Sequence, residues 1–444
     1  ATVPPAATGE ASPDAVPQEE AGSNVVVAVR LRPPADTSED VKEMFSATPT
    51  TVILRDPLSR GRHEHAFSFS RVFMPEAGQD TVFQYVARPL ISHLLKGFNS
   101  CCFAYGQTGS GKTHSVFGEG NRDLRGMLAR SIEYLFEKVE TVAATKEVGM
   151  AVSFAEVYLD QVRDLGRFYA EQRGRHVAGG LAAEGAQPAQ PAQPAKAAAE
   201  DAYLRQDLEI HESPQGLVYV EGLSLIPVSN IREVLEVANM GIRMRATYET
   251  RLNARSSRSH TIFTVSIAQQ ARDAKGGIVA SAVNFVDLAG SERLARSQSE
   301  GRRFQEAVVI NTSLSALGKV VLALASNHRG HVPYRDSKLT RILQNSLGGN
   351  AFTTMLTTID PSAKNYEESL NSLAFADRCK NVQNRPVQGV VPGDDGGQEE
   401  RMVQRLLAEV ADLQRQLSQC GGPSPRHGAA ALAAGPLAAA GAAE

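Results

Sequence analysis

The 444-residue sequence contains no tryptophan and only four cysteines, and its formal net charge is only −3. Four cysteines are too few for a disulfide framework in a chain of this length, and the neighbours Cys101 and Cys102 could be bridged only with strain. The cysteine content therefore predicts a reducing compartment. The small net charge argues against a protein that binds nucleic acid or membranes over its whole surface, although it allows a local basic patch.

Long apolar runs are absent as well, and none approaches the ~20 residues that a membrane-spanning helix needs. Residues 1–23 are polar and rich in Pro and Ala, unlike a secretory signal, and the first residue is not Met, which leaves open that the chain is a fragment. The remaining composition, 42% hydrophobic and 21% charged, is typical of a globular protein.

Segments with strand and helix patterns alternate between residues 24 and 384, which predicts one α/β domain around a central sheet rather than two domains. Two stretches do not fit this domain. Residues 1–23 are expected to be a disordered extension, because they offer little to bury. Residues 166–206 contain AQPAQPAQPA and are expected to form a low-complexity insert in a surface loop, dispensable for the fold.

The C-terminal part of the chain changes character after the domain. Residues 385–398 are rich in Pro and Gly and predict a linker. Residues 399–419 carry Val and Leu at spacings of 3, 4, 3 and 4, which predict a short helix or the start of a coiled coil. Residues 420–444 are a low-complexity tail of Ala, Gly and Pro.

Residues 106–113, GQTGSGKT, fit the phosphate-binding pattern G-x-x-x-x-G-K-[ST] between a strand-like and a helix-like segment. The glycines let successive N–H groups point at phosphate oxygens, and the helix N-terminus adds its positive end. Lys112 is expected to bind the β- and γ-phosphates, and the Thr113 hydroxyl to bind Mg²⁺. A chance glycine-rich turn is the alternative, but every fixed position and the strand–loop–helix context match. The nucleotide-binding candidates are Gly106, Gln107, Thr108, Gly109, Ser110, Gly111, Lys112, Thr113 and His114.

Two further segments have the composition of elements that sense a γ-phosphate. VNFVDLAGSE, residues 283–292, places Asp287 at the end of an apolar strand and Gly290 where its N–H could bind the γ-phosphate. NARSSRSH, residues 253–260, is dense in hydroxyl and basic side chains. Taken alone, the first could be ordinary turn chemistry, and the second a solvated loop and helix cap. Chance explains poorly why all three motifs occur together.

These motifs resemble the phosphate loop, switch I and switch II of the kinesin motor family. The flanking segments agree: VRLRP (29–33), VVINTSLSALG (308–318), VPYRDSKLTRILQNSLGGN (332–350) and SLAFADRCKNV (372–382). The resemblance covers roughly residues 24–390. It implies a single three-layer αβα phosphate-loop NTPase domain, with a mostly parallel central sheet of about eight strands. It also implies a microtubule-stimulated ATPase that uses ATP and Mg²⁺ in the cytoplasmic microtubule cytoskeleton.

The resemblance also assigns roles in the nucleotide site by position. Arg30, Pro33 and His114 would surround the adenine. Thr113 and Ser257 would ligate Mg²⁺ directly, and Asp287 would do so through water.

Four residues would serve the chemical step. Ser256 would relay a proton from the attacking water, and Gly290 would donate its N–H. Arg258 and Glu292 would form the ion pair that closes the switches and orients that water. Without a strong base, catalysis would depend on positioning and charge stabilisation.

A microtubule-facing surface is implied for two basic groups, which taken alone could be solvated surface charge. They are Arg293, Arg296, Arg302, Arg303, Arg335, Lys338 and Arg341. Val308 and Thr312 occupy positions where kinesins usually have Lys, so two positive charges are missing. This predicts weaker or more salt-sensitive microtubule binding.

Two functional classes fit these features. The first is an ATP-driven microtubule motor. The second is a microtubule-bound structural or regulatory protein, for instance in the axoneme of a cilium. A generic phosphate-loop ATPase is a distant third. The expected partners are the microtubule and a self-association or partner through residues after 399, with no nucleic acid and no membrane span.

Gly389 falls where walking kinesins place an Asn that latches the docked linker, within the neck-linker-like segment 385–398. Glycine supplies no side-chain hydrogen bond and raises the entropy cost of ordering. We therefore expect inefficient docking and weak processivity, and we expect Gly389→Asn to improve gliding or single-molecule run length.

Overall fold

The computed structural model describes residues 23–33, 45–56, 63–119, 123–171, 206–213, 216–252, 258–272, 277–292, 302–326 and 330–391. Several predictions from the sequence lie outside these residues: the extension, most of the insert, the heptads and the tail. Ser256, Ser257, Arg293 and Arg296 lie outside them as well, and so do the side chains of Arg302 and Arg303.

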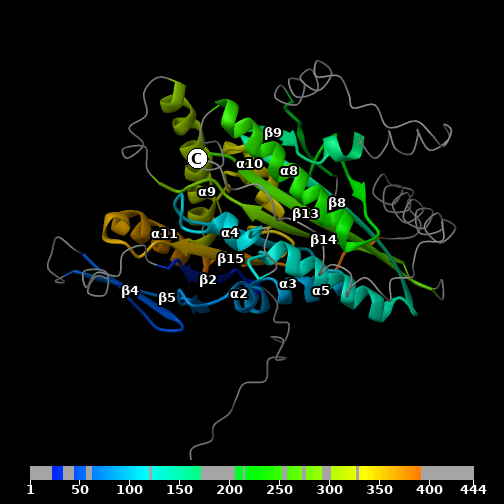
Figure 1. The fold of residues 1–444 in the computed structure, drawn as a ribbon, viewed down its shortest axis with the longest axis horizontal. Helices are drawn as coiled ribbons and strands as arrows, with labels where there is room; N and C mark the ends of the chain where they lie inside the picture. Colours follow the sequence, from blue (N-terminus) through cyan, green and yellow to red (C-terminus); the bar gives the residue numbers. More distant parts are fainter. Residues whose placement is uncertain are drawn as a thin grey trace, which may run out of the picture.

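A sheet forms the centre of the domain, and the part of the chain that the structure describes supplies ten strands to it (Figure 1). Its main path has eight, which confirms the expected number. Their order is β12 (Ile226–Pro227), β8 (Lys146–Tyr158), β13 (His260–Ala271), β14 (Ile278–Asp287), β7 (Ser100–Tyr105), β15 (Phe352–Ile359), β2 (Val26–Leu31) and β6 (Arg71–Phe73). At the sides, β9 (Gln161–Asp164) pairs with β8, and β17 (Val390–Val391) pairs with β14.

The sheet is mixed. Neighbours from β14 to β6 run parallel, whereas β12, β8, β13 and β14 pair antiparallel. The parallel half requires crossover connections, and its strands are correspondingly buried on both faces. Each of the six residues of β7, for example, is buried. The carboxyl ends of β7 and β14 lie side by side, so the loops that follow these two strands meet at one edge.

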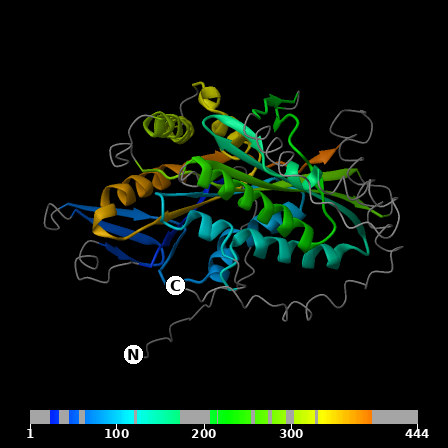
Figure 2. The same cartoon turned by 45° about the horizontal axis from the view of Figure 1, so that its top comes forward.

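Helices cover both faces and give the three predicted layers (Figure 2). One face packs against α2 (Gln79–Val86), α3 (Arg88–Leu95), α5 (Met127–Val142) and α8 (Ile231–Leu252). The other packs against α9 (Arg302–Ala325), α10 (Lys338–Ile342) and α11 (Tyr366–Cys379). Neighbouring side chains of a strand alternate between these cores, so Cys102 enters the first and Cys101 the second. Both are free thiols.

Smaller strand pairs decorate the domain. β3 (Phe45–Ala47), β4 (Thr51–Arg55) and β5 (Glu64–Ser68) form a separate sheet, and β10 (Ile210–Glu212) pairs with β11 (Val218–Val220) as a hairpin. No helix in the described part of the chain is both long and apolar enough to cross a membrane.

The segment after α11 lies along the domain. β16 (Gln383–Asn384) pairs with β1 (Ser23–Asn24), and β17 extends the sheet beside β14. Between them, Gly389 N donates to Gly97 O (2.9 Å), and Ala280 N donates to Gly389 O (2.8 Å). The main chain of Gly389 therefore holds this segment against the domain without a side-chain hydrogen bond.

Gly389 has no room for a side chain in this arrangement. A Cβ at this position would lie 2.0 Å from Ala280 O, a main-chain atom that cannot easily move. An Asn side chain therefore cannot latch this arrangement, and the reason given for improved gliding or run length in Gly389→Asn is wrong. The predicted weakness of docking in the unchanged chain stays a prediction.

Candidate active site

The phosphate-binding loop connects β7 to α4 (Lys112–Val116), as the motif predicts. Gly106 adopts φ +148°, and a Cβ there would lie 2.1 Å from Thr358 O in β15. Only glycine allows the loop to approach β15 so closely. Ser110 then fastens the loop, because its Oγ donates to Gln107 O (2.8 Å) and lies 2.7 Å from Thr358 Oγ1.

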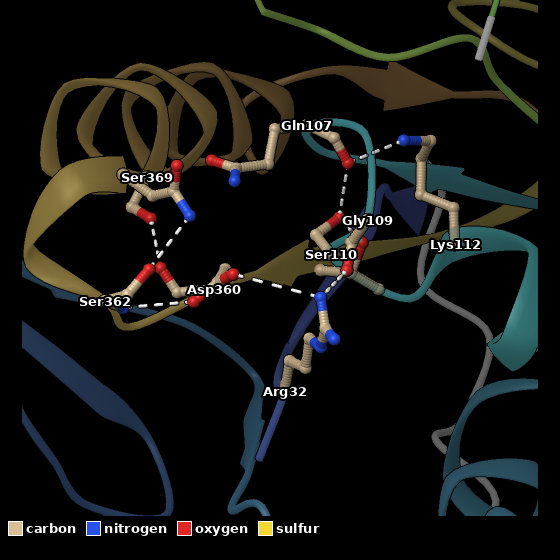
Figure 3. A network of polar contacts seen from close by, with 10 residues as sticks. Arg32, Gln107, Gly109, Ser110, Lys112, Asp360, Ser362 and Ser369 are labelled. Carbon is tan, nitrogen blue, oxygen red and sulfur yellow. Dashed lines mark hydrogen bonds and ion pairs between the residues drawn. The ribbon is translucent and has the colours of Figure 1, made fainter. Parts of the chain in front are cut away.

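Arg32 holds the outer side of the loop from the end of β2 (Figure 3). Its Nη1 donates to Gly109 O (2.6 Å) and lies 3.9 Å from Asp360 Oδ2, at the end of β15. The Asp360 carboxylate also accepts from Ser362 N (3.0 Å). The loop is thus braced from β15, a neighbour of β7, and from β2, the next strand of the sheet. Sequence reasoning missed Arg32, although the motif VRLRP contains it.

Lys112 is buried beneath the loop, with 7% of its surface exposed. Its Nζ donates to Gly106 O (2.7 Å) and Gln107 O (2.8 Å), so the main chain satisfies the ammonium group. Burial lowers the pKa of Lys112, whereas the carboxylates of Asp287 and Glu292 act in the opposite direction. The predicted phosphate-binding lysine therefore lies at the head of α4, held in place by the loop that it serves.

Thr113 and Asp287, both predicted to hold Mg²⁺, are in direct contact. Thr113 Oγ1 donates to Asp287 Oδ2 (2.6 Å) across the facing ends of β7 and β14. Asp287 Oδ1 is buried and has no hydrogen-bond partner among the described residues. A hydroxyl beside an unsatisfied carboxylate oxygen is a donor set that suits Mg²⁺ or its water ligands. These residues therefore fit the ion.

Mg²⁺ usually binds to one or two protein oxygens together with substrate phosphates. Within the described ranges, no group of three or more His, Cys, Asp and Glu side chains could enclose a metal ion. The contact between Thr113 and Asp287 supplies two protein oxygens of this kind.

Arg245 is a site residue that sequence reasoning missed. Its Nη1 lies 3.4 Å from Asp287 Oδ2, and the two side chains are only 5% and 1% exposed. The guanidinium also donates to Ser259 Oγ and Ser259 O, both at 3.1 Å. Arg245 belongs to α8 and therefore connects this helix to the start of β13 and to the end of β14. The sequence around Arg245 contains no recognisable motif and therefore did not indicate this role.

Glu292 contacts the phosphate loop in this conformation. Its carboxylate accepts two hydrogen bonds from Thr108, one from the main-chain N (2.8 Å) and one from Oγ1 (2.5 Å). Gly290 lies against the same contact, since a Cβ there would be 2.3 Å from both Glu292 Oε2 and Thr108 Oγ1. The pair between Glu292 and Arg258 stays a prediction for a state in which the switches close.

His260 connects the switch II loop to α9. Its Nδ1 accepts from Ala289 N (3.0 Å), and its Nε2 lies 3.0 Å from Ser313 Oγ. Since Nδ1 accepts, the neutral ring carries its proton on Nε2 and donates it to Ser313. Burial, followed by the positive charges of Arg245 and Lys112, lowers the pKa of His260 to about 3. The ring therefore stays neutral at physiological pH.

The predicted adenine residues lie at the other end of α4. Arg30 Nη1 donates to Gln79 Oε1 (2.9 Å) and Ser115 Oγ (2.8 Å), and burial lowers its pKa. His114 lies 3.5 Å from Glu119, and burial followed by the charge of Arg30 lowers the pKa of the imidazole. Pro33 is exposed just after β2. Their contact with adenine stays a prediction.

Comparisons with known proteins agree with this site. A family model described as the kinesin motor domain matches residues 30–382. The chain belongs to the kinesin motor family. Among kinesins, it is 38% identical over 325 residues to kinesin-related protein 3 of Dictyostelium discoideum, covering 72% of this chain and 24% of that protein. It is 35% identical over 405 residues to kinesin-like protein KIF3C of Pongo abelii, covering 84% of this chain and 46% of that protein.

The chain thus spans less than half the length of these curated kinesins. A solved structure entitled as that of a fast kinesin is 33% identical, with a TM-score of 0.68. The match covers 85% of this chain and 96% of the solved one. The kinesin motor fold that the motifs implied is therefore confirmed.

Three of the predicted microtubule-facing residues of this kinesin have described side chains, and they lie in α10 or just before it. Arg335 is exposed. Lys338 Nζ lies 2.6 Å from Asp207 Oδ1, and Arg341 Nη2 lies 2.5 Å from Glu212 Oε2. The structure thus brings two of the three basic side chains into ion pairs with acidic residues that the sequence reading did not consider.

Proposed function

We propose that this kinesin motor domain hydrolyses ATP with Mg²⁺ and couples its nucleotide state to microtubule binding and movement. The observation that carries the proposal is the set of contacts made by residues 287–292. Asp287 and Glu292 contact the phosphate loop, while Ala289 is hydrogen-bonded to His260, which reaches Ser313 on α9. A shift of residues 287–292 would therefore change contacts at the nucleotide site and at α9 together.

Each site residue has a defined task in this proposal. Lys112 and the loop N–H groups would bind the phosphates of ATP. Thr113 and Asp287 would hold Mg²⁺, which neutralises phosphate charge when bound. Arg32 and Ser110 keep the loop in shape, and Arg245 holds Asp287 in orientation. Catalysis would then arise from positioning and charge stabilisation rather than from a strong base.

Lys112→Ala tests this assignment. We expect the variant to lose ATP turnover both with and without microtubules, because the remaining loop cannot neutralise the phosphate charge. The matched control is Lys138→Ala, which removes an exposed lysine on α5 that is paired with Glu137. Substantial turnover in Lys112→Ala would show that the hydrolytic site lies elsewhere.

The second class, a microtubule-bound protein with little motility, is favoured by one observation. Lys338 and Arg341 are engaged by Asp207 and Glu212, which leaves less free positive charge toward an acidic microtubule. A gliding assay at several salt concentrations separates the two classes. Steady gliding supports a motor, whereas microtubule-stimulated turnover without movement supports a tether. In both, we place the protein on the microtubule cytoskeleton.

A further inference from the structure

We propose that Asp207 and Glu212, here called the acidic pair, limit how tightly the α10 face binds a microtubule. The α10 face consists of Arg335, Lys338 and Arg341. The inference rests on the proposed function and goes beyond it, because it names residues that set the strength of the contact.

The two basic side chains on α10 lie three positions apart and therefore share one side of the helix. Ser337 begins the helix as its N-cap, with its Oγ accepting from Thr340 N (3.1 Å). The main-chain N–H of Lys338, the first residue of the helix, donates to Asp160 Oδ1 (2.8 Å). Asp160 belongs to the β8–β9 turn, in which Leu159 and Asp160 have φ of 52° and 58°. This left-handed turn is costly for Leu and places a carboxylate at the positive end of α10.

Neighbouring strands also position the two residues of the acidic pair. Asp207 Oδ1 accepts from Val162 N in β9 (3.0 Å) and from Lys338 Nζ (2.6 Å). Glu212 is the last residue of β10, a strand that contacts α10. It accepts from Arg341 Nη2, whose guanidinium also donates to Gln344 Oε1 through Nη1 (2.5 Å). Both basic groups are therefore bound by carboxylates, one tied to β9 and the other carried by the β10–β11 hairpin.

The charges of the α10 face are thereby largely cancelled. A third pair, Lys319 with Asp336 at 3.1 Å, lies beside it. Within the described part of the chain, Arg335 forms no ion pair and is exposed. Each cation of this surface except Arg335 thus has a carboxylate next to it. These carboxylates repel the carboxylates of an acidic partner and oppose its approach.

The exposure of these pairs indicates that they tune binding rather than prevent it. The side chains of Asp207 and Glu212 are 41% and 37% exposed, and those of Lys338 and Arg341 are 27% and 15% exposed. Ion pairs that are partly exposed to water are weaker than fully buried ones, so a partner's carboxylates can exchange for them. Removing one acidic charge should therefore strengthen microtubule binding roughly two- to fivefold.

The test is co-sedimentation with microtubules of Asp207→Asn, Glu212→Gln and the double variant, at several salt concentrations. Both substitutions keep an acceptor oxygen, so Asn at 207 can still bind Val162 N. The matched control is Glu209→Gln, which makes the same change in net charge within the same segment. Glu209 is 80% exposed and faces His211 rather than α10.

We expect each acidic-pair variant to bind roughly two- to fivefold more tightly than the unchanged protein, with a steeper loss of binding as salt rises. Glu209→Gln should change the affinity much less. Equal affinities of the acidic-pair variants and the control, or weaker binding of the variants, would overturn the inference. If the unchanged protein fails to bind at low salt, the proposed function itself is wrong. Glu212→Gln keeps the test decisive if Asp207→Asn does not fold, because the Glu212 side chain contacts α10 and not β9.

Discussion

The nucleotide site and the α10 face both contain arginine–carboxylate pairs, but the pairs differ in exposure. Arg245 and Asp287 are 5% and 1% exposed, whereas Arg341 and Glu212 are 15% and 37% exposed. Water cannot solvate a buried charge that has lost its partner, so the folded state requires both members of the first pair. The second lies where water or a protein partner can replace either member. Similar chemistry therefore serves a permanent scaffold in one region and an exchangeable contact in the other.

The largest expected effect is on stability. Arg245→Ala leaves the carboxylate of Asp287 buried without its guanidinium, and we expect a loss of about 3–5 kcal/mol in the free energy of unfolding. Arg341→Ala, in the exposed pair, should lose less than about 1 kcal/mol. Urea unfolding of both variants measures the difference. Equal losses would break the comparison, because burial would then not distinguish the two pairs.

The next effect concerns the chemical step. Glu292→Ala should lower kcat at least about 100-fold, the order expected for a lost transition-state contact, while nucleotide affinity changes little. The contact between Glu292 and Thr108 shows that the carboxylate reaches the phosphate loop. Glu137→Ala on α5 is the control. A variant that keeps its turnover and loses nucleotide affinity would show that Glu292 binds rather than assists catalysis.

Gly389 tests a contact made by main chain alone. Gly389→Asn should disfavour the docked arrangement of residues 385–391 by about 1–3 kcal/mol, because its Cβ would meet Ala280 O. A spin label at Val387, which is 62% exposed, should then report greater mobility. Arg385→Asn introduces the same side chain in the same segment and should leave the label unchanged. Reduced mobility in Gly389→Asn would restore the latch expected from the sequence.

The smallest expected effect is a pH dependence within the buried region. The pKa of His260 is about 3 in the folded chain, below the ordinary value of 6.5. The unfolded chain therefore takes up the proton first as the pH falls, so the stabilisation is complete above pH 6.5 and is lost toward pH 3. Between pH 7.5 and 5.5, the protein should lose about 1.4 kcal/mol more than His260→Asn does. Identical losses, measured by urea unfolding at both values, would show that His260 is not buried as a neutral ring.

Much of the nucleotide site was predictable because its residues act through local chain geometry. The loop 106–111 follows a buried strand and precedes α4, and Asp287 ends β14, as the patterns indicated. The partners of these residues were not predictable. Arg32, Arg245 and Thr108 meet their partners across 77, 42 and 184 positions, distances over which periodicity carries no information.

The expected sheet was confirmed in its strand number, although antiparallel pairing of one half follows from tertiary context. β8, β13 and β14 are long enough to pair along most of their lengths, and this register is set by the partner strands rather than by any single strand. The expectation for Gly389 failed for a related reason. A missing side chain was read as a missing contact, whereas the main chain of Gly97 and Ala280 supplies it.

The amino-acid sequence by itself determined the residue types at the nucleotide site, the strand–loop–helix unit that presents them and membership of the kinesin family. These depend on short spacings, which the covalent chain enforces directly. Only the tertiary structure decided which charges are buried in pairs and which remain exchangeable. Lys338 and Arg341 looked like free basic residues in the sequence, and the fold brings Asp207 and Glu212 to them from more than a hundred positions away. Electrostatic free energy depends on distance and burial in space, and neither quantity is encoded in the neighbourhood of a residue along the chain.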